Sequence, residues 1–140
     1  MDYNKYTTLV VSHDPTEADI RRNVLEGAGF KVVRASELRA IRRACEKQAI
    51  SLVMIGYSLP PSEKRRVWDE IRQTCDGNVP VLELYNKGKQ DLVGSHALFV
   101  HESHTPDDFI GAVESIPIRR NRVRHLDTVR SIALIRTQGG

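Results

Sequence analysis

The chain has 140 residues, of which 40% are hydrophobic and 28% charged, the proportions of a single soluble globular domain with its own core. Its apolar runs are too short to span a membrane, and its first residues lack the basic start and apolar stretch of a signal peptide. The two cysteines, Cys45 and Cys75, match no metal-binding or redox spacing, so we expect free buried thiols in a reducing cytoplasm.

Five short apolar runs, taken in chain order, predict five strands at residues 7–11, 30–34, 52–55, 79–84 and 97–100. Helical patterns alternate with these runs and begin at four predicted N-caps: Asp14, Ser36, Ser62 and Thr105. Residues 86–95 contain little apolar support and predict only a short or frayed fourth helix. The helical pattern that follows Thr105 ends at Pro117.

Two carboxylates attract attention in these elements. Glu17 stands three residues after Asp14, which is the spacing of a capping box. Glu83 interrupts the apolar run of the fourth strand, and we expect it to reach the exposed end or face of that strand, because a desolvated carboxylate is costly. We interpret the charged run at residues 63–66 as a solvated helix face.

Strand alternating with helix predicts an α/β fold with a parallel sheet that is covered by helices on both faces. Right-handed crossovers leave few topologies, and a flavodoxin-like, doubly wound five-stranded sheet in the order 2-1-3-4-5 suits this length. We predict one domain over residues 1–116 and a basic tail over residues 117–140. The tail has six arginines and one aspartate, a net charge of +5, which leaves −2 for the domain.

Residues 6–116 resemble the receiver domain of two-component response regulators. The resemblance rests on LVVSHDPTEADIRRNVLEGAGFKVVRAS, on LVMIGYSLP followed by EIR, on NVPVLEL, and on TPDDFIGAVESI. It implies a place in signal transduction or a phosphorelay. It also implies that phosphoryl chemistry, where present, lies at the carboxyl edge of the sheet.

The five positions that would carry this chemistry all depart from the family pattern. Ser12 and His13 stand where receivers have two Mg²⁺-binding acids, and Gly56 stands where they have the phosphate-accepting aspartate. Tyr85 replaces a threonine or serine, and His101 replaces a lysine. Because aspartyl phosphorylation needs a carboxylate nucleophile and a hard cation, we predict that the chain is no enzyme and holds no Mg²⁺ or other cofactor.

The resemblance then implies a degenerate receiver that binds a signalling protein without phosphorylation. A homodimer through the fourth helix, fifth strand and fifth helix is a further possibility of this kind. We expect Tyr85 to fill the space left by Gly56. The histidines at 13 and 101 are either remnants of a lost site or a replacement site for a transition metal or a pH sensor.

The basic tail supports an alternative function. It offers possible contacts to an anion or a partner at Arg119, Arg120, Arg122 and Arg124. One interpretation is an amphipathic segment that docks on the domain or on a second copy, or a disordered segment. The other is an arm that binds nucleic acid or an anionic membrane surface through phosphate groups.

Overall fold

The computed structural model describes residues 6–75, 78–86, 91–92, 94–99 and 105–116. It contains five strands: β1 Thr7–Val11, β2 Lys31–Ala35, β3 Leu52–Ile55, β4 Val81–Tyr85 and β5 His96–Phe99. Four helices lie in the described residues: α1 Pro15–Gly27, α2 Leu38–Lys47, α3 Pro61–Thr74 and α4 Pro106–Glu114. The predicted strands are therefore all present, with their ends shifted by up to two residues.

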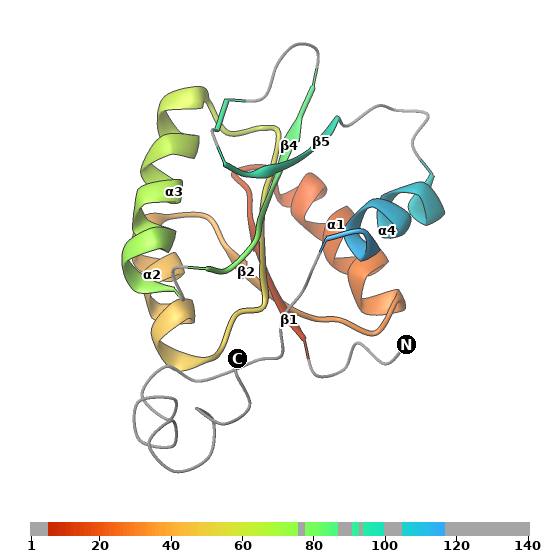
Figure 1. The fold of residues 1–140 in the computed structure, drawn as a ribbon, viewed down its shortest axis with the longest axis horizontal. Helices are drawn as coiled ribbons and strands as arrows, with labels where there is room; N and C mark the ends of the chain where they lie inside the picture. Colours follow the sequence, from red (N-terminus) through yellow and green to blue (C-terminus); the bar gives the residue numbers. More distant parts are fainter. Residues whose placement is uncertain (1–5, 76–77, 87–90, 93, 100–104, 117–140) are drawn as a thin grey trace.

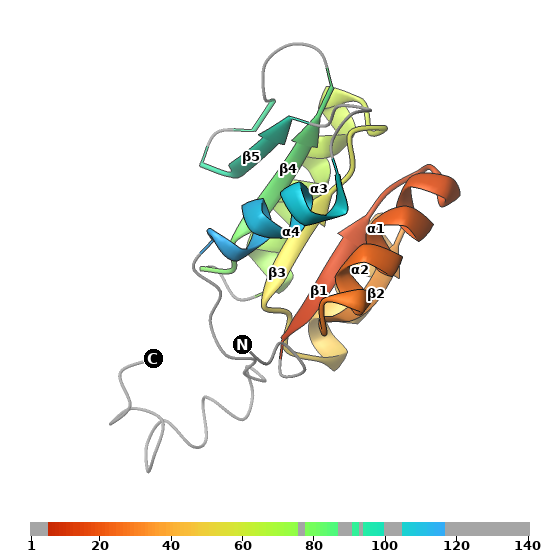
Figure 2. The ribbon, with the colours of Figure 1, turned by 90° about the vertical axis from the view of Figure 1, so that its right-hand side faces the viewer.

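All strand pairs are parallel, and the order is β2-β1-β3-β4-β5, which confirms the predicted flavodoxin-like topology. The sheet separates two helical layers, with α2 and α3 on one face and α1 and α4 on the other (Figures 1 and 2). β3 lies in the middle of the sheet, and all four of its residues are fully buried. Its uninterrupted apolar sequence is therefore explained by helices packing on both faces.

Each helical layer covers its own apolar cluster. Alternate residues of the strands point to opposite faces, so that Val53 and Ile55 pack toward α2 and α3 while Leu52 and Met54 pack toward α1 and α4. This alternation gives two cores that share one sheet. It also places the side chain of Glu83, which pairs with Ile55, on the α2–α3 face.

The helix caps follow the prediction at only two of four helices. Asp14 accepts a hydrogen bond from the Thr16 amide, and Thr105 accepts one from the Asp108 amide, as predicted. The predictions for Ser36 and Ser62 are wrong, because α2 begins after Glu37 and α3 begins after Pro60. Neither of these N-cap positions makes a side-chain capping bond.

The connection between β4 and β5 differs from the predicted pattern. Residues 86, 91–92 and 94–95 are not helical, and the remaining residues of the predicted fourth helix lie outside the described part of the chain. Leu92 is nevertheless buried in the α2–α3 core. The described part of this connection therefore forms a loop, and the predicted dimer through a fourth helix stays a prediction.

Candidate functional site

Three of the site positions predicted from the sequence, Ser12, Gly56 and Tyr85, lie at the carboxyl edge of the sheet. The Ser12 amide donates to Ala35 O at 3.2 Å, and the Gly56 amide donates to Val11 O at 2.7 Å, so the ends of β1, β2 and β3 are held in register. Tyr85 is the last residue of β4 at the same edge. His101 lies outside the described residues, as do the four tail arginines at positions 119, 120, 122 and 124.

The carboxylate of Glu17 occupies this edge. Its Oε1 accepts hydrogen bonds from Ser12 Oγ at 2.7 Å and from Ser58 Oγ at 2.9 Å. Its Oε2 accepts one from the backbone amide of Tyr57 at 2.9 Å. Glu17 is 4% exposed, so three neutral donors replace the water that a carboxylate needs. We call Ser12, Glu17, Gly56, Tyr57 and Ser58 the acceptor corner.

Gly56 is the residue that makes room for this carboxylate. A Cβ atom added at Gly56 would lie 2.9 Å from Glu17 Cδ and 3.1 Å from Glu17 Oε2, too close for either atom to stay in place. The side chain nearest to Gly56 is thus that of Glu17, and not that of Tyr85, which we expected to fill this space. A carboxylate is present at the corner after all, but it comes from α1 instead of from the end of β3.

The capping box predicted for Glu17 is also wrong. The Asp14 amide, which Glu17 would accept in a capping box, donates instead to Ser12 Oγ at 3.1 Å. The Glu17 side chain points across to the loop after β3. The N-terminus of α1 is therefore capped by Asp14 alone, while Glu17 joins α1 to the β3 end.

A guanidinium lies one helical turn beyond Glu17. Arg21 stacks over the Phe109 ring of α4, with its Cζ 4.9 Å from the ring centroid. Burial lowers the pKa of Arg21 from its ordinary value, and the nearby Glu17 carboxylate opposes this effect. Since arginine stays protonated in proteins, Arg21 contributes positive charge next to the corner.

His13 turns away from the acceptor corner. Its Nε2 lies 3.0 Å from Glu63 Oε2 of α3, with 41% of each side chain exposed. Among the described residues, no group of three or more His, Cys, Asp or Glu could hold a metal ion. Because His101 lies outside the described part, the predicted choice between a remnant and a replacement histidine site stays a prediction.

The Mg²⁺ ion that the family resemblance implies does not fit this corner. Mg²⁺ demands near-octahedral oxygen ligands and favours carboxylates with free lone pairs. Here the Ser12 hydroxyl is committed to Glu17, the Asp14 carboxylate caps α1, and His13 faces Glu63. The single carboxylate that remains, Glu17, already accepts three hydrogen bonds.

A second buried carboxylate lies on the α2–α3 face. Glu83 is fully buried, and its Oε2 lies 3.0 Å from Lys64 Nζ. Lys64 is itself only 2% exposed. The Asp91 and Leu92 amides donate to Glu83 at 2.8 and 3.0 Å, and Lys64 also contacts the Asp91 carboxylate at 3.3 Å. Glu83 therefore does not reach solvent as predicted, and Lys64 is no part of a solvated face.

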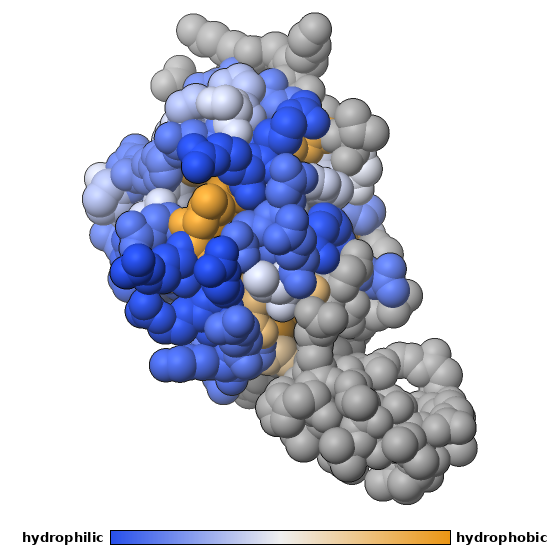
Figure 3. Space-filling model, turned by 90° about the vertical axis from the view of Figure 1, so that its left-hand side faces the viewer, coloured by the Kyte–Doolittle hydropathy of each residue, from blue (hydrophilic) through white to orange (hydrophobic). Residues whose placement is uncertain are grey.

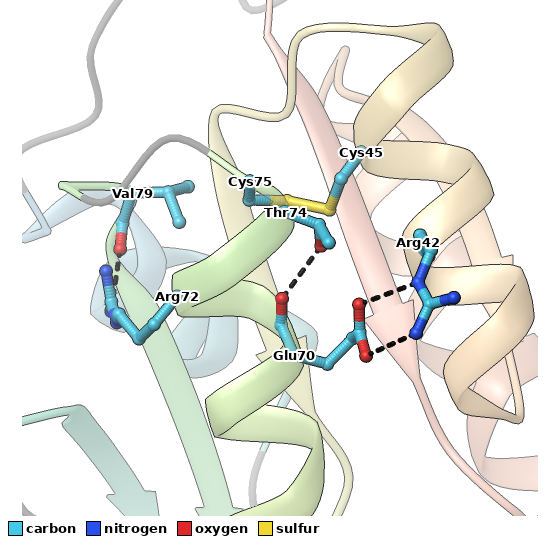
Figure 4. The surroundings of a disulfide bond; sticks show 7 residues. All are labelled: Arg42, Cys45, Glu70, Arg72, Thr74, Cys75 and Val79. Atoms are coloured by element: carbon cyan, nitrogen blue, oxygen red, sulfur yellow. Dashed lines mark hydrogen bonds and ion pairs between the residues drawn. A yellow bond between two sulfur atoms is a disulfide. The ribbon is translucent and has the colours of Figure 1, made fainter.

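The two cysteines form a disulfide, which overturns the prediction of free thiols (Figure 4). Cys45 lies near the end of α2 and Cys75 directly follows α3, so the bond joins the ends of the two helices. Near it, Arg42 of α2 makes two hydrogen bonds to the Glu70 carboxylate of α3, at 3.1 and 3.2 Å. These bonds raise the pKa of Arg42 above its ordinary value and fix the two helices side by side.

Sequence reasoning singled out Glu17 and Glu83 but assigned them other roles, and it missed the disulfide. The sequence did hold a signal for the partner of Glu83. An acidic residue inside a buried strand requires a counter-charge, and Lys64 lies in the first turn of α3, which begins at the carboxyl edge of the sheet. For Glu17 the capping-box spacing gave a sufficient local explanation. Its tertiary role could be recognised only together with Gly56, 39 positions away in the printed sequence.

No protein-family model matches the chain, and no curated protein sequence is similar to it. Solved structures of receiver domains do match its fold. The Vibrio cholerae chemotaxis protein CheY4 has a TM-score of 0.66 at 16% identity, covering 80% of this chain and 98% of that one. A putative response regulator from Chloroflexus aurantiacus has a TM-score of 0.63 at 22% identity, covering 79% and 95%.

A third similar structure is the receiver domain of a Pseudomonas aeruginosa sensor histidine kinase, which holds a magnesium ion in its active-site cleft. Its TM-score is 0.59 at 17% identity, and the match covers 79% of this chain and 95% of that domain. At such identities the likeness is one of fold. In the described part of the chain, no helix is long and apolar enough to cross a membrane.

Proposed function

We propose that the chain is a degenerate receiver-like domain that acts in signal transduction as a phosphorylation-independent protein–protein interaction module, not as an enzyme. The observation that carries this proposal is the Glu17 carboxylate, which fills the acceptor corner beside Gly56. An acceptor at the end of β3 would need the same space. The hydroxyl and amide donors that could bind an incoming phosphoryl group are already bonded to Glu17.

Acetyl phosphate with Mg²⁺ tests the loss of phosphoryl transfer. We expect no base-labile phosphoryl adduct by intact mass spectrometry, while an active receiver domain treated in parallel becomes phosphorylated. The variant Gly56→Asp should also stay unmodified, because Glu17 blocks the new side chain and Ser12 and His13 supply no Mg²⁺ site. A Mg²⁺-dependent adduct on the unaltered chain would refute the proposal.

The partner in this proposal is a signalling protein. The alternative partner is a second copy of the chain, which would bind at the surface formed by β5 and α4. Sedimentation velocity over a range of protein concentrations tests the homodimer. Substitution of an exposed residue of α4, such as Asp108→Arg, should then shift any dimer toward monomer.

We include a cytoplasmic location in the proposal, and this location must be compatible with the Cys45–Cys75 disulfide. The bond persists among cytoplasmic thiols only if its reduction potential lies below that of the glutathione pool. Both cysteines are buried, at 7% and 3% exposure, so access of a reductant is restricted. Equilibration in glutathione redox buffers, with thiol trapping and mass spectrometry, measures that potential directly.

The charge of the tail favours the alternative function, a small protein that binds nucleic acid or an anionic surface. Six arginines against one aspartate are enough to contact several phosphates. Changing Arg119, Arg120, Arg122 and Arg124 to glutamate in the full chain should abolish any salt-dependent shift of duplex DNA. If the unaltered chain does not shift duplex DNA at low salt, this alternative is excluded.

A further inference from the structure

An open groove lies between the N-terminal halves of α2 and α3, on the face opposite α1 and α4. Its volume is about 550 Å³, and its lining consists of His13, Ser36, Glu37, Leu38, Arg39, Glu63, Arg66 and Val67. We call this the α2–α3 groove. It is separate from the acceptor corner, since none of the residues bonded to Glu17 lines it.

The arginines of α2 and α3 fall into two groups. Arg42 is bonded to Glu70, Arg65 donates to Asp91 O, and Arg72 donates to Val79 O. Three others have no hydrogen bond or ion pair with the described part of the chain, and these are Arg39, Arg43 and Arg66. Two of these three, Arg39 and Arg66, line the α2–α3 groove, so two guanidiniums without a bonded partner in the described residues face a ligand there.

The lining also holds two carboxylates, Glu37 and Glu63, which balance the two arginines in formal charge. Glu63 is paired with His13 at 3.0 Å, which leaves Glu37 as the lining carboxylate without a partner among the described residues. Leu38 is half-buried and supplies apolar surface between the charged side chains, whereas Val67, also in the lining, is only 5% exposed. The space-filling view of this side of the molecule shows small hydrophobic patches within a mostly hydrophilic surface (Figure 3).

The walls of the groove are held in place before any ligand arrives. The bidentate Arg42–Glu70 pair and the disulfide both join α2 to α3. On the inner side of α3, Lys64 is anchored to Glu83. The backbones of α2 and α3 therefore lose little conformational freedom on binding, which favours recognition of a partner.

We propose that the α2–α3 groove docks an acidic segment of a partner protein, a proposal that rests on the interaction-module function above. Carboxylates of the segment bind Arg39 and Arg66, and an apolar side chain between them packs on Leu38. Paired arginines suit carboxylates, because each guanidinium can donate two parallel hydrogen bonds.

Two other classes of ligand fit the groove less well. Single-stranded nucleic acid stacks its bases on large aromatic side chains, whereas no Phe, Tyr or Trp lines this groove. A small molecule is usually enclosed on most of its surface. Here Ser36, Arg39 and Arg66 are exposed, so a ligand stays partly open to solvent, as a segment of a longer chain does.

The probe for this proposal is a fluorescein-labelled peptide with glutamates on both sides of a central leucine, titrated into the full chain at low salt. We expect saturable binding by fluorescence polarisation, and amide shifts in ¹⁵N spectra confined to the first turns of α2 and α3. Arg39→Glu and Arg66→Glu should each weaken binding by about tenfold or more. A peptide with glycine in place of leucine should bind several-fold more weakly.

Arg43→Glu is the matched control, because it makes the same charge change on an exposed, uncommitted arginine of α2 outside the groove. We expect it to change the affinity less than twofold. An equal loss from Arg43→Glu, no binding of the peptide, or tighter binding of duplex DNA at the same residues would each overturn the proposal. Phosphorylation by acetyl phosphate would refute the proposed function alone, since peptide binding is measured on unphosphorylated protein.

Discussion

Glu17 and Glu83 are two buried carboxylates that the molecule stabilises in different ways. Glu17 is held by two hydroxyls and one backbone amide, with no lysine or arginine bonded to its oxygens in the described residues. Glu83 is bonded to the Lys64 ammonium and to two backbone amides of the β4–β5 connection. One carboxylate is compensated by neutral donors and the other by a cation.

The difference shows how each site responds to the loss of one neighbour. A carboxylate among several neutral donors loses one hydrogen bond at a time. A carboxylate in a buried ion pair loses its counter-charge at once, and the remaining charge is left uncompensated. Removing the partner of Glu83 should therefore destabilise the fold more than any single change around Glu17.

The largest effect is expected from Lys64→Met, which leaves Glu83 buried without its cation. We expect the free energy of unfolding to fall by about 3–5 kcal/mol, measured by urea denaturation. The double variant Lys64→Met/Glu83→Gln should recover part of this loss, because it also removes the charge. A loss no larger than that of an exposed substitution, such as Arg43→Met, would contradict the role assigned to the pair.

Gly56→Ala tests the steric side of the acceptor corner. The new methyl group would displace the Glu17 carboxylate, so we expect a loss of about 2–3 kcal/mol in unfolding free energy. Gly111→Ala is the matched control, since an added Cβ there meets nothing within 4 Å, and it should stabilise α4 slightly. Combining Gly56→Ala with Glu17→Ala should cost less than the sum of the single changes, because the clash disappears.

Glu17→Gln tests the electrostatic side of the same corner. The amide group keeps the volume but turns one acceptor into a donor, which then faces the Tyr57 amide or the serine hydroxyls. We expect a loss of about 1–2 kcal/mol by urea denaturation. Glu63→Gln, which breaks a half-exposed pair with His13, should change stability by less than about 0.5 kcal/mol.

Ser58→Ala should have the smallest effect. Glu17 Oε1 keeps its bond to Ser12, and Ser58 is partly exposed, so water can reach the vacated position. We expect a loss of about 1 kcal/mol or less. If Ser58→Ala proved as damaging as Lys64→Met, the distinction between the two kinds of buried carboxylate would not hold.

The fold could be predicted because its signals are local. The apolar run 52–55 marks a strand buried on both faces, and Asp14 followed by Pro15 marks a helix start. Alternation of such signals leaves few topologies, and the order 2-1-3-4-5 follows. The segment 86–95 was the weakest prediction because it offers little apolar periodicity, and its described residues are indeed not helical.

The site could be predicted only in part, because its contacts join distant parts of the chain. Gly56 and Ser12 could be singled out because they depart from the receiver pattern that the sequence resembles, yet nothing local shows that Glu17 occupies the space beside Gly56. The expectation for Glu83 failed for a related reason. The desolvation argument assumed a lone carboxylate, whereas Lys64 from another element supplies the counter-charge.

The disulfide has a consequence for the covalent connectivity of the chain. Residues 45–75 form a closed ring that contains all of β3 and α3 and the exposed loop at Tyr57. A protease that cuts after Tyr57 therefore divides the backbone without releasing a fragment, because the two pieces stay joined through the sulfur atoms. The nicked protein would migrate as one species on a non-reducing gel and as two after reduction, so its turnover depends on thiols as well as on proteases.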